Sequence, residues 1–255
     1  MLPLIRSIYK SAVPAEFRFW LYKKRNPVHM ANLRKRVNPS PKGDFSLAPY
    51  DQKKAIFVHI TKTAGTSVAL TLFGALPYHY RAWEYRVIFG KKDFNDYFKF
   101  AFVRNPWDRL YSAFSFLKGG GWDDIDKRWA EENLAGIDDF NDFVINWLTP
   151  ERLYAHMHFW PQSDFICDSK NRVMIDYLAY FETIGDDFKR IANQINCEQS
   201  LQHTNASKRK GYKDVYSEEA RQKVALLYAR DINNFGYRFD GFTRQRVDGE
   251  SFVSE

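Results

Sequence analysis

Cysteine is scarce in this sequence: Cys167 and Cys197 are the two in 255 residues. Two cysteines cannot build the disulfide framework of a small secreted scaffold, although a single bridge between them stays open. They lack the C-x-x-C spacing of a structural zinc site, and no H-E-x-x-H motif occurs. We therefore expect no metal site, and a reducing, cytoplasmic compartment is the simpler expectation.

Long apolar runs and the common nucleotide fingerprints are also missing. No apolar stretch is long enough to span a bilayer, and Arg6 and Lys10 interrupt any signal-peptide-like region near the start. Neither the G-x-G-x-x-G of Rossmann domains nor the G-x-x-x-x-G-K-[ST] of P-loop NTPases occurs. A soluble chain without either nucleotide fingerprint is therefore expected.

What is present is enough for one large α/β domain with a basic extension. Of the residues, 45% are hydrophobic and 17% aromatic, which suffices for a substantial core. The net charge of +7 is uneven, because ten Lys or Arg against two acidic residues in 1–50 give +8 there and about −1 elsewhere. We predict a basic N-terminal arm (1–50), a domain (51–240) and a mobile tail (241–255).

The basic arm has two interpretations. Its interleaved aromatic and cationic residues allow it to pack on the domain, or to lie peripherally on an anionic membrane surface. Packing is the favoured expectation. Nucleic acid is not an expected partner, because the arm contains no recognition module.

The first chemically informative segment is a strand followed by a hydroxyl-rich turn. Residues 55–60 form a short apolar run typical of a buried parallel strand, and a helix is predicted over 67–73. Between them, Lys62 supplies a cation and Gly65 allows close backbone approach. A helix start attracts anions, so this turn suits a phosphate or sulfate group. An ordinary strand-to-helix turn is the alternative.

A second segment repeats this design. Residues 98–103 read as an apolar strand that leads into Arg104. Asn105 is a good helix N-cap and Pro106 suits the first helical position. Ser112 then lies one helical turn beyond Asp108. Because ligands of open α/β sheets bind beyond the carboxyl ends of the strands, both segments are expected to face one crevice.

Together the two segments resemble the PAPS-dependent sulfotransferases, most closely their carbohydrate-acting, Golgi-type branch. Residues 61–67 are similar to that family's 5′-phosphosulfate loop and residues 102–114 to its 3′-phosphate motif, with weaker similarity as far as Tyr237. The resemblance implies a three-layer, P-loop-like α/β fold with a central, mainly parallel sheet flanked by helices. It also implies transfer of a sulfuryl group from 3′-phosphoadenosine 5′-phosphosulfate (PAPS) to a hydroxyl of a carbohydrate (glycan) or similar acceptor. The product would be adenosine 3′,5′-bisphosphate, and no metal is required.

The resemblance also assigns roles within the donor site. Lys62 would stabilise the charge that grows on the leaving phosphate, and Arg104 with Ser112 would bind the 3′-phosphate. A late basic loop containing Lys208 and Arg209 loosely resembles one that closes over that phosphate, although a solvated surface loop is an equal alternative. The residues that would hold the 5′-phosphate with Lys62 are Thr63, Ala64, Gly65, Thr66 and Ser67.

The acceptor hydroxyl needs a general base. His79 is the first candidate, since carbohydrate-acting relatives carry a histidine in this region and imidazole titrates near neutral pH. Glu84 is the second, and for both an ordinary structural role is the alternative. His158, in an aromatic segment that suits a sugar, is a candidate substrate contact. The His156-x-His158 pair lacks the further ligands of a zinc site.

The rest of the chain reads as alternating helices and strands, which indicates a mainly parallel sheet with helices on both faces. Helices are predicted over 137–148, 184–195 and 217–234, the last capped by Ser217 and closed by Gly236. Strands are predicted over 173–175 and 177–181. Two other functions stay open: a nucleotide-dependent phosphoryl-transfer enzyme, and a non-catalytic nucleotide-binding relative.

Overall fold

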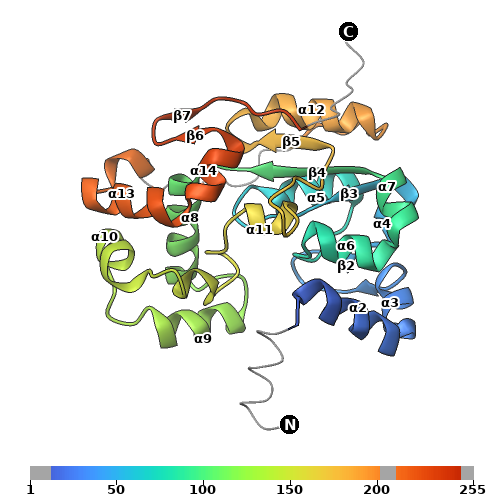
Figure 1. The fold of residues 1–255 in the computed structure, drawn as a ribbon, viewed down its shortest axis with the longest axis horizontal. Helices are drawn as coiled ribbons and strands as arrows, with labels where there is room; N and C mark the ends of the chain where they lie inside the picture. The colour runs from blue at the N-terminus through green and yellow to red at the C-terminus, as the bar shows by residue number, and fades with distance from the viewer. Residues whose placement is uncertain (1–12, 202–210, 248–255) are drawn as a thin grey trace.

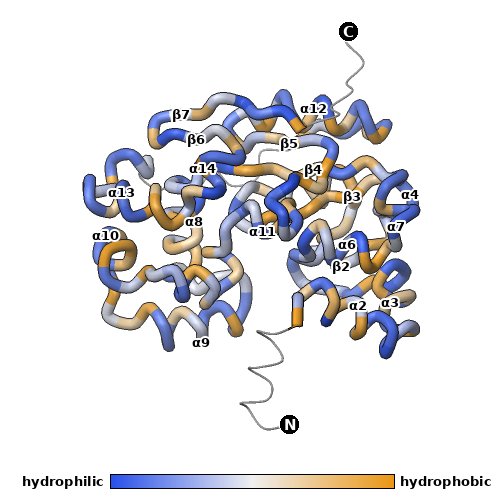
Figure 2. Tube along the Cα trace, viewed as in Figure 1, coloured by the Kyte–Doolittle hydropathy of each residue, from blue (hydrophilic) through white to orange (hydrophobic). Residues whose placement is uncertain are grey.

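A computed structural model describes residues 13–201 and 211–247 and has a parallel sheet at its centre (Figure 1). The strand order is β3 (Ala55–Phe57), β4 (Phe98–Val103) and β5 (Tyr177–Tyr180). Apart from Phe98, all residues of these strands are buried, which fits their largely apolar sequences; the charged Lys99 in β4 is buried as well. Figure 2 shows this apolar concentration along β3 and β4. The expected α/β fold, a central parallel sheet flanked by helices, is confirmed.

The two strand-to-helix segments form much as their local signals indicate. The bounds of β4 match the prediction, and α8 (Pro106–Lys118) begins at the expected proline. Asn105 caps α8, because its side-chain oxygen accepts a hydrogen bond from the Trp107 N–H at 3.1 Å. Strand β3 stops three residues short of the prediction, and α5 (Gly65–Phe73) begins two residues early.

The remaining helices contribute side chains to two buried apolar clusters. One buried apolar cluster surrounds the sheet, and a second joins α8 to the helices beyond it. Helices near the sheet are α4 (Ala48–Lys53), α6 (Ala82–Phe89), α7 (Lys91–Asp96), α11 (Ser163–Ile166) and α12 (Ile184–Gln194). The helices α9 (Asp124–Asn133), α10 (Phe140–Asp142), α13 (Glu218–Leu227) and α14 (Ala229–Phe235) lie after α8 in the chain.

Two predicted helices differ from the prediction. The helix predicted over 137–148 is the short α10 followed by a π-helical turn, Phe143–Trp147, because Asp139 caps it two residues late by accepting the Asp142 N–H at 2.9 Å. The single helix predicted over 217–234 divides into α13 and α14 at Tyr228, whose hydroxyl donates to the Phe159 carbonyl at 2.6 Å. The Ser217 cap and the left-handed Gly236 closure are confirmed.

The strand predicted over 173–175 is wrong. Val173 makes one isolated bridge, to Cys167, because the Asp168 carboxylate binds the Lys170 and Arg172 N–H groups and folds this stretch into a turn. Residues 241–247 of the predicted tail pack on the domain. There β7 (Gly241–Phe242) pairs with β6 (Tyr237–Arg238), and Arg244 forms an ion pair of 2.8 Å with the buried Asp187.

The described part of the N-terminal arm contains two helices and a short β-hairpin. Helix α2 (Ala15–Arg25) packs on α6, where the Phe19 ring meets the Trp83 ring edge-on at 5.6 Å. Helix α3 (Pro27–Leu33) is followed by Arg34, which forms ion pairs with Asp51 and Asp93. The hairpin pairs β1 (Val37–Asn38) with β2 (Phe45–Ser46). Over residues 13–201 and 211–247, none of the helices combines the length and apolarity needed to span a bilayer.

Candidate active site

The turn between β3 and α5 has a strained backbone. Lys62 and Ala64 adopt φ values of +66° and +62°, in the left-handed region that non-glycine residues avoid at a cost of about 1–2 kcal/mol each. The surrounding structure holds this turn in place: the Thr63 hydroxyl donates to the Ile60 carbonyl at 2.9 Å. Strain of this kind is concentrated at ligand sites, so the turn is a candidate binding loop.

The start of α5 differs from the start of α8. The N-cap residue of α5 is Ala64, which has no side-chain oxygen and makes no capping hydrogen bond, whereas Asn105 caps α8. Thr66 and Ser67 are half-buried on the first turn of α5, while Thr63 is fully buried. An uncapped helix start attracts anions through its N–H groups and its positive dipole end. The predicted 5′-phosphate loop therefore has a helix terminus suited to an anion.

Gly65 also has a packing role that the sequence did not reveal. A Cβ atom at this position would lie 2.0 Å from Cδ2 of His59, a distance that real contacts do not reach. The His59 ring is buried and stacks on Phe57 with 5.3 Å between ring centroids. Glycine at position 65 is therefore required by the packing of the loop on His59.

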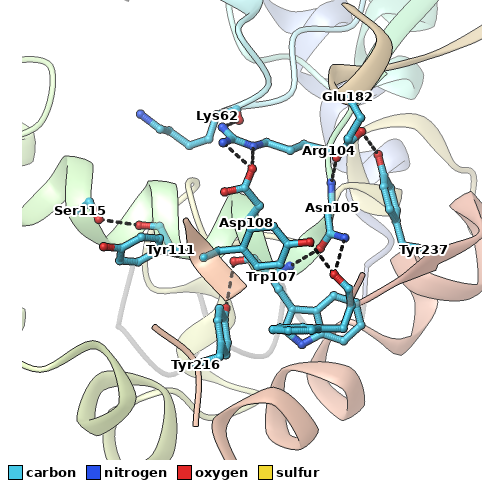
Figure 3. A network of polar contacts seen from close by, with 12 residues as sticks. Lys62, Arg104, Asn105, Trp107, Asp108, Tyr111, Ser115, Glu182, Tyr216 and Tyr237 are labelled. Atoms are coloured by element: carbon cyan, nitrogen blue, oxygen red, sulfur yellow. Dashed lines mark hydrogen bonds and ion pairs between the residues drawn. The ribbon is translucent and has the colours of Figure 1, made fainter. Parts of the chain in front are cut away.

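Arg104 joins the two predicted motifs (Figure 3). Its Nη1 donates to the Lys62 carbonyl at 3.0 Å, and its Nε donates to the Asp108 carboxylate at 2.7 Å. The guanidinium carbon also lies 4.0 Å from the centre of the Phe181 ring. The carboxyl ends of β3 and β4 thus face one site, as predicted, and Ser112 lies half-buried one turn beyond Asp108 on α8.

The ammonium group of Lys62 lies against an aromatic side chain of α8. Its Nζ is 3.6 Å from the centroid of the Phe116 ring, and the edge-on His158 ring is 5.0 Å from that same ring. Burial lowers the pKa of His158 to about 4, and the nearby charge of Lys62 contributes. The structure therefore brings His158, a predicted substrate contact, close to Lys62.

The two base candidates have different surroundings. His79 Nδ1 is 2.9 Å from the His59 carbonyl, and this contact assigns Nδ1 as the donor and leaves the lone pair on Nε2. Burial lowers the pKa of His79, which favours the neutral form that can accept a proton. Glu84 instead accepts the Arg81 N–H at 2.7 Å and so caps α6, while burial raises the pKa of its carboxyl group. Of the two candidates, His79 keeps a nitrogen lone pair, on Nε2, whereas Glu84 is engaged at the start of α6.

Sequence reasoning missed Asp126 and the contacts of Arg109. The Asp126 carboxylate lies 3.2 Å from His156 Nε2 and 3.9 Å from His158 Nε2. Burial alone would raise the pKa of Asp126, but the nearby His158 ring and the hydrogen bond that the carboxylate accepts from the Trp122 amide outweigh burial and lower it. Asp126 lies in the acidic first turn of α9, where a carboxylate is common because it faces the positive end of the helix dipole, so its position in the sequence does not single it out.

Arg109 is fully buried and donates hydrogen bonds to the backbone at the start of the Lys62 loop. Its Nε donates to the Thr61 carbonyl and its Nη1 to the Trp160 carbonyl, both at 2.9 Å. A guanidinium on the buried face of α8 is the sequence signal that would have indicated this role. Lys208 and Arg209 lie outside the described residues, and among residues 13–201 and 211–247 no group of three or more His, Cys, Asp or Glu is arranged to hold a metal ion.

Comparison with known proteins places the chain in a family. The sequence model of one family, described as the sulfotransferase family, matches residues 81–238, more than half of the chain. This range includes Arg104, Ser112 and His158 and begins after the Lys62 loop. An uncharacterized protein of Archaeoglobus fulgidus is 30% identical over 121 residues, which are 47% of this chain and 85% of the relative. No solved structure gives a significant match. The chain belongs to the sulfotransferase family.

Proposed function

We propose that this protein transfers a sulfuryl group from PAPS to a hydroxyl of a carbohydrate or similar acceptor. Membership of the sulfotransferase family supports sulfotransfer in general. The observation that carries the proposal is the bond between the two motifs: Arg104, after β4, donates to the carbonyl of Lys62, in the strained loop after β3. A cation and an uncapped helix start thus lie at the ends of two neighbouring parallel strands.

The donor site divides into two anion subsites. Lys62 and the residues that follow it, Thr63 to Ser67, would hold the 5′-phosphate at the start of α5, through backbone N–H groups and the half-buried hydroxyls. Arg104 and Ser112 would hold the 3′-phosphate. Because Arg104 now binds Asp108, a phosphate at this subsite would have to replace that carboxylate as its partner.

Lys62 would act on the leaving group. As the acceptor oxygen bonds to sulfur, the bond from sulfur to the 5′-phosphate oxygen breaks and negative charge grows on that oxygen. The Lys62 ammonium, next to the Phe116 ring, would stabilise this charge more in the transition state than in the ground state.

The acceptor's proton must move as the new bond forms. His79 would take it on Nε2, since its Nδ1 is held by the His59 carbonyl. His158 lies near Lys62 and packs against the rings of Phe116 and His156, and His156 in turn packs against Trp129. Aromatic faces with polar edges are suited to bind the faces and hydroxyls of a sugar. We assign the acceptor to this side of Lys62.

Donor binding and transfer test the proposal together. Isothermal titration with adenosine 3′,5′-bisphosphate and with ATP should show tighter binding of the bisphosphate, and transfer of labelled sulfate from PAPS should be found in a screen of glycans, lipids and alcohols. Bisphosphate binding without transfer to any acceptor would favour a non-catalytic relative. Tighter ATP binding would favour phosphoryl transfer, although the chain lacks the Walker-type loop of such enzymes.

A further inference from the structure

A groove of about 970 Å³ lies between the arm and the domain, with no residue in common with the candidate active site. It runs between α2 and α3 on one side and α6 and the start of α7 on the other. Figure 1 shows α2 and α3 beneath α6, at the opposite side of the molecule from α13. The apolar side chains that line it include Phe17, Trp20, Met30, Trp83, Val87 and Ile88.

The charge of the groove is strongly positive. Five cationic side chains line it, against the single carboxylate of Glu16. Arg34 is neutralised by Asp51 and Asp93, but within the described part of the chain no carboxylate lies at ion-pair distance from the other four. Burial lowers the pKa of Lys23, and the positive charges of Arg34 and Lys24 contribute, so an anion here would relieve repulsion. The four are Lys23, Lys24, Arg86 and Lys91.

The rim of the groove exposes aromatic rings. Phe17 is 50% exposed and Trp20 is 44% exposed, and the two rings stack with 5.6 Å between centroids. The Lys24 ammonium lies 5.4 Å from the Trp20 ring, one turn further along α2. Exposed aromatic rings beside lysines are typical of helices that lie at a membrane interface.

We propose that this groove binds the headgroup of an anionic phospholipid in a bilayer surface, while Phe17 and Trp20 enter the interfacial layer. Charge complementarity selects an anion, and the exposed rings select a ligand presented at an apolar boundary. The arm therefore has two faces: Phe19 packs on Trp83, and the stripe of Phe17, Trp20 and Lys24 meets the membrane. Packing and membrane contact, taken as alternatives from the sequence, are compatible.

Vesicle co-sedimentation of the full-length protein tests this site. We expect binding to vesicles of phosphatidylcholine with phosphatidylserine, at least tenfold weaker binding to phosphatidylcholine alone, and weakening by salt. Lys24→Glu with Arg86→Glu should weaken binding at least tenfold, and Trp20→Ala should weaken it severalfold. The matched control is Ile125→Ala with Arg128→Glu on α9, which removes an exposed apolar side chain (71% exposed) and reverses one exposed charge elsewhere.

Three results would overturn the proposal: no sedimentation with anionic vesicles, equal binding of both vesicle types, or equal loss in the groove variants and the α9 control. Full displacement by millimolar glycerophosphoserine would also overturn it, because it would make the ligand a soluble anion. Thermal melting of each variant confirms that it is folded. Sulfate transfer to a soluble acceptor is measured separately, so a failure here is distinguishable from a failure of the proposed activity.

Discussion

The guanidinium of Arg104 donates a hydrogen bond to the backbone carbonyl of Lys62 at 3.0 Å. This bond crosses between the ends of β3 and β4, so it couples the position of the Arg104 guanidinium to the strained turn that presents Lys62. Asp108 holds the other side of the same guanidinium. Of the groups that position Arg104, the Asp108 carboxylate is the one that would compete with a phosphate.

Removing that competitor should strengthen binding of the donor product. Asp108→Asn deletes a negative charge 2.6 Å from Arg104, while the Lys62 carbonyl and the Phe181 ring still position the guanidinium. We expect adenosine 3′,5′-bisphosphate to bind about three- to tenfold more tightly, measured by titration calorimetry. Asp138→Asn, which removes a 91% exposed carboxylate from Lys118, is the control. Weaker binding by Asp108→Asn would show that the carboxylate is needed to orient Arg104.

Glycine at position 65 should be essential for stability. Gly65→Ala places a methyl group against the buried His59 ring, and overpacking of this kind costs about 1–3 kcal/mol in the free energy of unfolding. Gly185→Ala on α12 meets no atom within 4 Å and should be neutral or slightly stabilising. Chemical denaturation compares the two. The second change His59→Ala should recover part of the loss, and no loss in Gly65→Ala would contradict the packing role.

Mild acid should destabilise the protein through its buried histidines. The pKa of His158 is about 4 in the folded protein because of burial, against about 6.5 when unfolded. The unfolded state then binds more protons between these values, so stability is complete above pH 6.5 and falls as the pH drops towards 4. His158 alone should cost about 2 kcal/mol at pH 5.

Denaturation at pH 7 and pH 5 measures this slope. His158→Gln should show a shallower loss of stability than the wild type. Burial also lowers the pKa of His59 and His79, so a residual slope is expected in the variant. Equal slopes for His158→Gln and wild type would contradict the assigned burial effect.

Local signals predicted the strand-to-helix segments well, because an apolar run followed by Asn105-Pro106 leaves few alternatives. The features that the sequence did not predict depend on contacts between residues far apart in the chain. Arg244 holds the tail through the buried Asp187, 57 positions away, and Tyr228 divides a predicted helix by reaching the Phe159 carbonyl. Asp126 contacts His156, 30 positions away, and lies near His158. None of these pairings has a spacing that periodicity can reveal.

The same limit applies within the site. The sequence shows that Lys62 precedes Gly65. It does not show the left-handed backbone at Lys62 or the His59 ring against Gly65, because both depend on the packing of the folded chain. The roles of Lys62, Arg104, Ser112 and His79 stay predictions, and those of Lys208 and Arg209 lie outside the described residues.

The most direct test of the account is the effect of Lys62→Ala on sulfuryl transfer. With labelled PAPS and the best acceptor from the screen, single-turnover transfer should fall at least about 100-fold, because the cation at the leaving oxygen is lost. Binding of adenosine 3′,5′-bisphosphate should weaken far less, and the melting temperature should stay near that of the wild type. Lys170→Ala, at an exposed turn position, should behave as the wild type. Wild-type transfer by Lys62→Ala would contradict the central role assigned to this residue.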